Sequence, residues 1–125
     1  MTENEISYKI RGAIFNVYNG VGPGLLESVY EAALAYELRK KGLEVQTQLG
    51  LPFVYEDMQL DVGYRLDILV DNKVIVEVKS VEQLSNVHYK QLLTYLKLSE
   101  KKLGILVNFN TDQIDQSIKR IVNNL

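Results

Sequence analysis

The sequence predicts an α/β fold in which a mixed β-sheet is flanked by helices. Residues 64–70 and 73–79 alternate apolar and polar side chains, as strands with one buried face do. Residues 103–109 form a continuous apolar run, which is typical of a strand covered on both faces. Apolar residues recur at helical spacing within 4–19 and 86–98. We therefore expect hairpins on one side of the sheet and a last strand delivered by a crossover helix.

The N-terminal part of the chain predicts two helices separated by a flexible loop. The first helix is expected over residues 4–19, and the glycine-rich run 20–24 follows it. The second helix is expected from Glu27 to about Lys41, where Gly42 ends it because glycine readily adopts left-handed backbone angles.

The remaining elements follow in order after the second helix. Strands are expected near 43–49, 52–56, 59–62, 64–70 and 73–79, a helix near 86–98, a strand at 103–108 and a final helix from Asp112. At 125 residues, the chain has the length of one domain with its own hydrophobic core.

The register of one hairpin can be predicted from its side-chain pattern. A two-residue loop would place the apolar face of one strand beside the charged face of the other. A three-residue loop over Asp71–Lys73, with one residue in the left-handed region, pairs Val70 with Val74 and Asp67 with Glu77. Burial of the apolar side chains and clustering of the carboxylates both require this second register, which we therefore predict.

In the predicted register the apolar side chains of both strands face one core, and the charged side chains face away from it. The apolar set consists of Leu66, Ile68, Val70, Val74, Val76 and Val78. On the other face Asp67 meets Glu77, and Arg65 meets Lys79.

Two opposed carboxylates are destabilising unless a positive charge lies between them. Their hard oxygen atoms suit Mg²⁺ or Mn²⁺, and Mg²⁺ typically takes one or two protein carboxylates together with substrate phosphate. Lys79 lies on the same face as Glu77, where it could hold or deprotonate a water and stabilise charge on a phosphate. The alternative is a solvated surface ion pair between Glu77 and Lys79, with Asp67 as a surface acid.

These residues resemble the signature of the PD-(D/E)XK nuclease superfamily. Asp67 with Glu77-x-Lys79 on a hairpin matches the superfamily motif, although Leu66 replaces the proline of its name. Further segments resemble the GxxExxY family within that superfamily, and together they cover nearly the whole chain. They are Gly24-Leu-Leu-Glu27-Ser-Val-Tyr30, Tyr30–Leu34, Tyr64–Asp67, Gln91–Leu96 and Gly104–Phe109. The resemblance implies a restriction-endonuclease-like sheet flanked by helices.

The resemblance also implies roles for further residues. Glu27 would join Asp67, Glu77 and Val78 as a metal ligand, whereas its alternative role is to compensate the dipole of the helix that it opens. Gln91 lies four residues before a tyrosine, as in related nucleases where this glutamine contacts the surroundings of the metal or the nucleic acid backbone. The alternative for Gln91 is the boundary of an ordinary amphipathic helix.

Composition limits the function classes. The chain has no cysteine, which excludes disulfides and thiolate zinc sites. No apolar stretch approaches a membrane span and the acidic start lacks a secretory layout, so a cytoplasmic location is expected. The formal net charge of −2 gives no overall attraction for a polyanion. Local basic groups at 39–41, 97–102 and 119–120 could compensate, although such groups at helix ends usually serve the dipole and solubility.

Three hypotheses remain from the sequence. The leading hypothesis is a magnesium-dependent nuclease that hydrolyses phosphodiester bonds in DNA by metal-activated water, with Asp67, Glu77, Lys79, Glu27 and Gln91 as its catalytic residues. The second is a nuclease-like fold that binds nucleic acid or a protein partner without cutting. The third is an assembly module whose acidic cluster has no catalytic use. A domain this small that acts on two strands would also benefit from pairing with a second copy.

Overall fold

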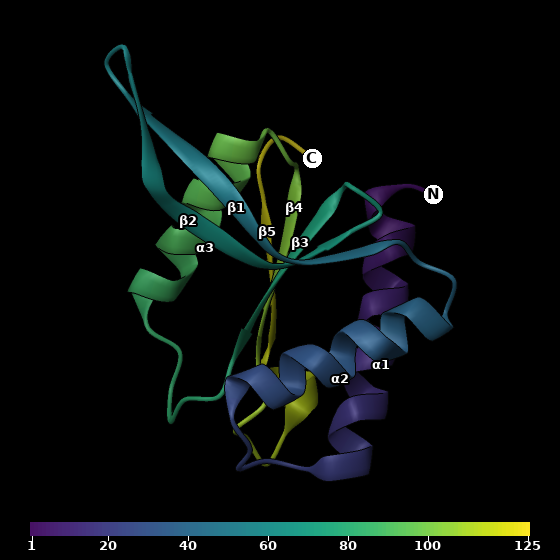
Figure 1. Ribbon diagram of the computed structural model, residues 1–125. Coiled ribbons are helices and arrows are strands. Elements are labelled where there is room, and N and C mark those ends of the chain that lie inside the picture. The colour runs from purple at the N-terminus through teal and green to yellow at the C-terminus, as the bar shows by residue number, and fades with distance from the viewer.

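The computed structural model confirms the predicted α/β fold, with a mixed sheet flanked by helices (Figure 1). It describes the backbone throughout and the side chains of residues 1–59 and 63–125. In chain order the elements are α1 (Glu3–Val21), α2 (Glu27–Lys40), β1 (Val45–Tyr55), β2 (Met58–Val70), β3 (Val74–Lys79), α3 (Asn86–Ser99), β4 (Leu103–Asn108), the 3₁₀ helix η1 (Ile114–Gln116) and β5 (Ile118–Val122). Within these described elements, no helix combines the length and apolarity that a membrane span requires.

The two N-terminal helices lie where the sequence predicts them. At the start of α1, the Thr2 hydroxyl accepts a hydrogen bond from the Glu5 amide (3.2 Å), and the Glu5 carboxylate accepts one from the Thr2 amide (3.0 Å). This reciprocal pair satisfies two of the amides that a helix start leaves without partners. Helix α2 ends before Gly42, whose φ of 84° is the left-handed conformation expected of a terminating glycine.

The sheet has the strand order β1-β2-β3-β4-β5. Strands β3 and β4 are parallel, with α3 as the crossover between them, and the other neighbouring strands are antiparallel. The four short strands predicted between residues 43 and 70 are instead two long ones, β1 and β2. The turn that joins them projects from the body of the molecule (Figure 1).

The predicted final helix from Asp112 is wrong. The segment contains only a short 3₁₀ turn, after which β5 pairs antiparallel with β4 from Ile118 opposite Val107 to Val122 opposite Leu103. The apolar residues of this segment fit a helical period as well as a strand. Pairing with the open edge of β4 decides between the two, because strand formation depends on tertiary context more than on local propensity.

The β2–β3 hairpin has the predicted register, with Val70 opposite Val74 and Ile68 opposite Val76. Its loop differs from the prediction, because both Asp71 (φ 50°) and Asn72 (φ 55°) are left-handed instead of one residue alone. A tight turn of this hand requires positive φ at both central residues. The described ladder starts at Ile68, so the predicted pairing of Arg65 with Lys79 does not form.

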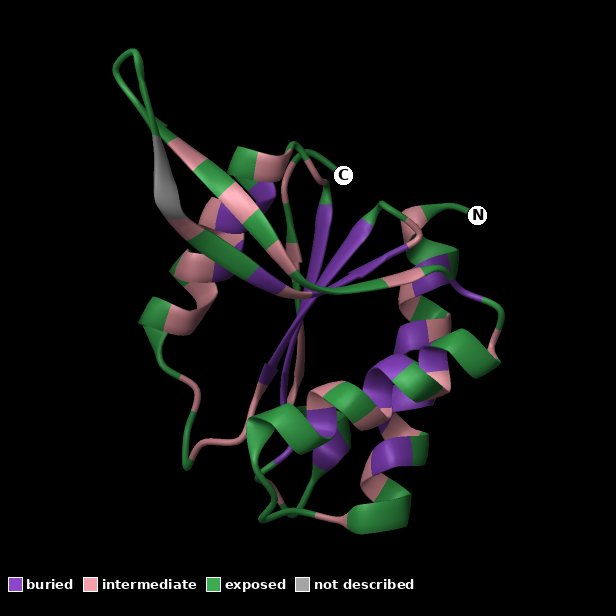
Figure 2. Cartoon of the chain, in the orientation of Figure 1, coloured by how far each residue is buried: buried purple, intermediate pink, exposed green. Residues whose placement is uncertain are grey.

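Two apolar clusters cover the two faces of the sheet, and the central strands are buried between them (Figure 2). The larger cluster joins α1 and α2 to the side chains of Ile68, Val70, Val74, Val76 and Val78. The smaller cluster joins α3 to Leu66, Leu69, Ile75 and Leu106. The expectation that Leu66 faces the same core as Ile68 is therefore wrong: the apolar residues of β2 change sides at Asp67, between these two residues.

Candidate active site

The carboxylates of Asp67 and Glu77 meet between β2 and β3, just beyond the last ladder pair of the hairpin. One Glu77 oxygen accepts a hydrogen bond from the Asp67 amide (3.2 Å), and one Asp67 oxygen accepts a bond from the Val78 amide (2.8 Å). Each carboxylate therefore replaces a main-chain partner that the separating strands no longer supply. The structure therefore brings these two predicted site residues together.

The position of Asp67 depends on an irregularity in the neighbouring strand. Gln48 lies opposite Asp67, between the pairs Thr47–Ile68 and Leu49–Leu66, and has a φ of 51°. A left-handed residue within a strand changes the local twist. On either side of Asp67 the apolar side chains of β2 lie on opposite faces of the sheet: Leu66 faces α3, and Ile68 faces α1 and α2.

Glu77 is a buried carboxylate, with 5% of its surface exposed. Burial, followed by the neighbouring charge of Asp67, raises the pKa of Glu77 from its ordinary value of 4.5 to about 9, and the ammonium of Lys79 acts in the opposite direction. A positive charge beside the two carboxylates would favour the ionised form of Glu77.

Glu27, at the first position of α2, is joined to the end of β3 through Ser80. The Glu27 carboxylate accepts a hydrogen bond from the Ser80 amide (3.2 Å), and the Ser80 hydroxyl donates to the Leu25 carbonyl (2.7 Å). Ser80 directly follows Lys79, so these two bonds fix the start of α2 next to the predicted catalytic strand. The Glu27 side chain is exposed, and its charge acts together with that of Asp67 on the pKa of Glu31. Among the described residues, no hydrogen bond joins Glu27 to Asp67 or Glu77.

Tyr30 holds the loop before α2 in place. Its hydroxyl donates to the Gly22 carbonyl and accepts from the Leu25 amide (3.1 Å), and its buried ring stacks on Phe109 with the centroids 4.4 Å apart. Tyr30 therefore belongs to the core and also connects the core to the loop that precedes Glu27.

Glu31 is a fourth acid near the site, and the sequence analysis did not assign it a role. Both of its carboxylate oxygens accept hydrogen bonds from the Gln48 amide group, at 2.9 and 3.0 Å. Burial raises the pKa of Glu31, and the charges of Asp67 and Glu27 add to that rise. The spacing of four residues from Glu27 was the available signal, because it places both acids on one face of a helix.

The two residues of the predicted glutamine–tyrosine pair have different surroundings in the structure. The buried Tyr95 lies close enough to the acids that the charges of Glu77 and Asp67 add to burial in raising its pKa to about 12. Gln91, one turn earlier in α3, lines a groove of about 260 Å³ together with Tyr64 of β2 and other residues of α3, among them Lys90. No hydrogen bond among the described residues joins Gln91 to the acids.

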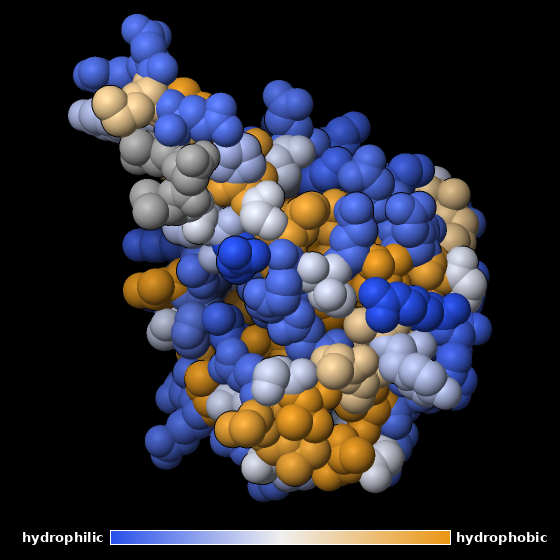
Figure 3. All heavy atoms as spheres, in the orientation of Figure 1, coloured by the Kyte–Doolittle hydropathy of each residue, from blue (hydrophilic) through white to orange (hydrophobic). Residues whose placement is uncertain are grey.

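An apolar surface lies beside the start of α2. The large exposed apolar side chains there are Val21, Leu25, Leu26 and Val29. Figure 3 shows an apolar area over the region where the loop between α1 and α2 meets the start of α2. The acidic site is therefore bordered on this side by apolar side chains.

Comparison with known protein families gives a match that covers most of the chain. Residues 4–121 match the PD-(D/E)XK nuclease superfamily, and this range includes every residue of the candidate site. The chain belongs to this superfamily. No curated protein and no solved structure matches the chain.

Nucleases of the PD-(D/E)XK superfamily usually use divalent metals. The donor set of this chain fits such an ion, because two oxygen ligands meet directly and one of them is buried next to a like charge. Among the described residues, however, no three His, Cys, Asp or Glu side chains are grouped closely enough to enclose a metal. The fit is therefore to an ion such as Mg²⁺, which keeps several waters and takes few protein ligands.

Proposed function

We propose that this protein is a metal-dependent nuclease that hydrolyses phosphodiester bonds in DNA, with Mg²⁺ or Mn²⁺ as its cofactor. The observation that carries the proposal is the direct meeting of Asp67 and Glu77, one of them buried, at the position where the superfamily motif requires two acids. Two adjacent carboxylates destabilise a folded chain unless they bind something positive. A site with only a structural role has no need of this arrangement.

Each site residue has a role in this proposal. Asp67 and Glu77 would hold the ion, with the Val78 carbonyl as a further ligand and Glu27 reaching the ion through one of its waters. The bound ion supplies Lewis acidity for activating water and charge for neutralising the phosphate. Lys79, whose charge already acts on Glu77, stabilises negative charge on the phosphate as the water attacks.

Gln91 contacts the nucleic acid backbone in this proposal. Its groove beside Tyr64 and Lys90 opens on the α3 side of the site, the side on which Tyr95 approaches Asp67 and Glu77. An amide at this point can donate to a phosphate oxygen next to the bond that is cut.

We also propose that the chain belongs to the GxxExxY family within the superfamily. Its defining residues are Gly24, Glu27 and Tyr30. The structure gives each a task that supports this assignment: Gly24 has a φ of 98°, Glu27 binds the Ser80 amide, and the Tyr30 hydroxyl ties the loop together.

Cleavage assays test the proposed activity. Supercoiled plasmid and single-stranded oligonucleotide are incubated with the wild-type protein, Asp67→Ala and Lys79→Ala, with Mg²⁺, with Mn²⁺ or with EDTA. We expect metal-dependent cutting by the wild type, and a loss of at least about a hundredfold in each variant, because each change removes a charged group from the reacting centre. Asp115→Ala and Lys102→Ala are matched controls, because both residues are exposed and lie outside the site, in η1 and in the turn before β4.

Two outcomes would contradict the proposal. Equal cutting by the wild type and both site variants would identify a contaminating nuclease as the source of activity. Metal binding by the wild type without cleavage of either substrate would favour the function of a binding module.

A further inference from the structure

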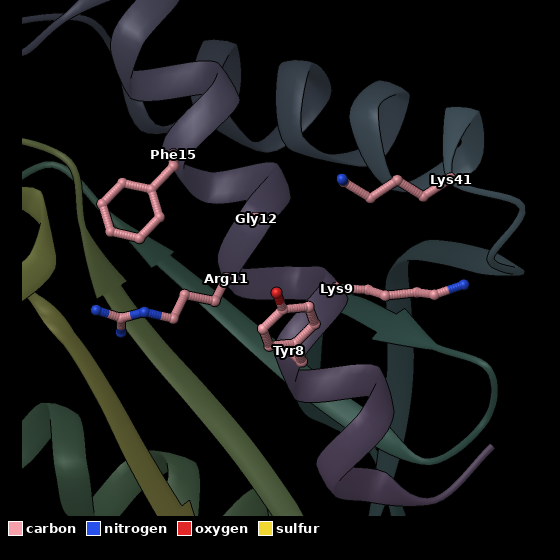
Figure 4. Close-up of a pocket in the computed structure, with 6 residues that line it drawn as sticks. All are labelled: Tyr8, Lys9, Arg11, Gly12, Phe15 and Lys41. Atoms are coloured by element: carbon pink, nitrogen blue, oxygen red, sulfur yellow. The ribbon is translucent and has the colours of Figure 1, made fainter.

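A hollow of about 610 Å³ lies on the outer side of α1, at the end of α2 (Figure 4). Its lining residues are Tyr8, Lys9, Arg11, Gly12, Phe15 and Lys41. The volume is within the range of 300–1,000 Å³ that is typical of ligand sites. None of these residues belongs to the acidic site described above.

Every charged residue that lines the hollow is a cation. Lys9, Arg11 and Lys41 gather here although the chain as a whole has a formal net charge of −2. Among the side chains that the structure describes, the one ion pair joins Lys40 to Glu37, and none of the three cations donates a side-chain hydrogen bond. Their charges are therefore available to an anionic ligand.

Two aromatic rings, Tyr8 and Phe15, line the hollow beside these cations. Tyr8 is 81% exposed, although it belongs to a helix with a well-formed apolar face. Figure 4 shows Lys9 and Arg11 extending to opposite sides of α1 with the Tyr8 ring between them. The Arg11 guanidinium lies 5.1 Å from the centre of the Phe15 ring. Cations that track a backbone, together with rings on which bases stack, form the usual surface for single-stranded nucleic acid.

Gly12 keeps the floor of the hollow open. Glycine in a helix interior costs about 1 kcal/mol relative to alanine. Packing does not explain this cost, because an added Cβ would meet only the end of the Lys41 side chain, at an ordinary 3.5 Å from its Nζ. Figure 4 shows Lys41 reaching from the end of α2 towards Gly12. The absence of a side chain at Gly12 thus leaves room between α1 and the Lys41 ammonium.

We propose that this hollow binds single-stranded nucleic acid, with its phosphates on Lys9, Arg11 and Lys41 and one base stacked on Tyr8. The proposal rests on the proposed function for the class of ligand, and it adds a second contact outside the acidic site. Helix α2 separates the hollow from the acidic site, because Glu27 begins the helix and Lys41 follows its last residue. At 1.5 Å per residue, the 14 residues of α2 span roughly 20 Å. The strand is held at the hollow while another part of it reaches the acids.

Fluorescence anisotropy tests the hollow separately from cleavage. The probe is a fluorescein-labelled 12-nucleotide oligothymidylate, in EDTA, with Asp67→Ala as the parent protein so that the strand stays intact. The double variant Arg11→Ser/Lys41→Ser should bind at least about tenfold more weakly. It should also reduce the slope of log Kd against log salt by about 1.4, because each phosphate contact to a single strand contributes about 0.7. Tyr8→Leu should weaken binding about fivefold or more through lost stacking, with the salt slope unchanged.

The matched control is Lys97→Ser/Lys102→Ser, which removes two exposed cations at the end of α3 and just beyond it. Equal weakening by this control would show attraction to net charge alone and would overturn the proposal. Full competition by polyglutamate, together with no effect of Tyr8→Leu, would indicate an acidic protein segment as the occupant and would also overturn it. Thermal melting of each variant verifies that the chain still folds.

The two proposals fail in distinguishable ways. If the oligonucleotide binds in an Arg11-dependent way but the wild type cleaves nothing, the proposed nuclease activity is refuted and the proposed binding at the hollow is supported. If the wild type shows metal-dependent cleavage but the Arg11→Ser/Lys41→Ser variant binds the oligonucleotide with unchanged affinity, the nuclease activity is supported and the binding at the hollow is refuted.

Discussion

Replacing Glu77 with glutamine should stabilise the metal-free protein at neutral pH. The pKa of Glu77 is raised to about 9, so the folded chain keeps at pH 7.5 a proton that the unfolded chain has released. The contribution of Glu77 to the free energy of unfolding is therefore highest below pH 4.5, where Glu77 is protonated in both the folded and the unfolded chain. It falls as the pH rises from 4.5 towards 9, because only the folded chain still holds this proton. At about 1.4 kcal/mol per pH unit, the loss by pH 7.5 is on the order of 4 kcal/mol. Glu77→Gln has the same shape without this titration.

Urea unfolding in EDTA at several pH values between 4.5 and 9 measures this effect. The free energy of unfolding of the wild type should decrease with pH relative to Glu77→Gln, and the two should coincide near pH 4.5. Glu82→Gln is the control, because it removes an exposed carboxylate from the loop after β3. Parallel pH dependences for the wild type and Glu77→Gln would contradict the expected effect, because ionisation of Glu77 would then not lower the stability of the folded chain.

Three further changes test the supports of the site and the packing of α3 on β4. Glu27→Gln should lower cleavage about 10- to 100-fold, as loss of a supporting group at a metal site does, with little change in melting temperature because the side chain is exposed. Tyr30→Phe should cost about 1–3 kcal/mol in urea unfolding, since a carbonyl and an amide of the glycine loop lose their partner, while the exposed Tyr36→Phe should cost nothing measurable. Gly104→Ala should cost about 1–3 kcal/mol, because its Cβ would lie 2.9 Å from three carbons of Leu92, and adding Leu92→Ala should make the alanine at 104 less costly than it is alone.

The hairpin was predictable because one constraint decided it. The side-chain period of a strand is two, so only an odd-length connection buries the branched residues of both strands and places Asp67 opposite Glu77. The structure has that register. The change of face at Asp67 could not be predicted in this way, because it coincides with the left-handed backbone of Gln48 in a different strand.

The parts that the sequence did not predict depend on contacts between distant segments. The chain from Asp112 forms strand β5 because the edge of β4 is available to pair with it, and local periodicity does not contain that information. Glu31 joins the acidic site through Gln48, 17 residues away. Lys9 and Arg11 lie far from Lys41 in the sequence. Basic runs in the sequence therefore reveal Lys41, which follows Arg39 and Lys40, but not the other two cations of the hollow.

Diffraction from crystals grown with Mn²⁺, recorded at the manganese absorption edge, tests directly the proposal that Asp67 and Glu77 hold a divalent ion. We expect one strong anomalous peak between the carboxylates of Asp67 and Glu77, and no peak there in Asp67→Ala crystals grown in the same way. Saturating Mn²⁺ with no peak at these two acids, or a side chain at residue 67 that projects away from residue 77, would contradict it.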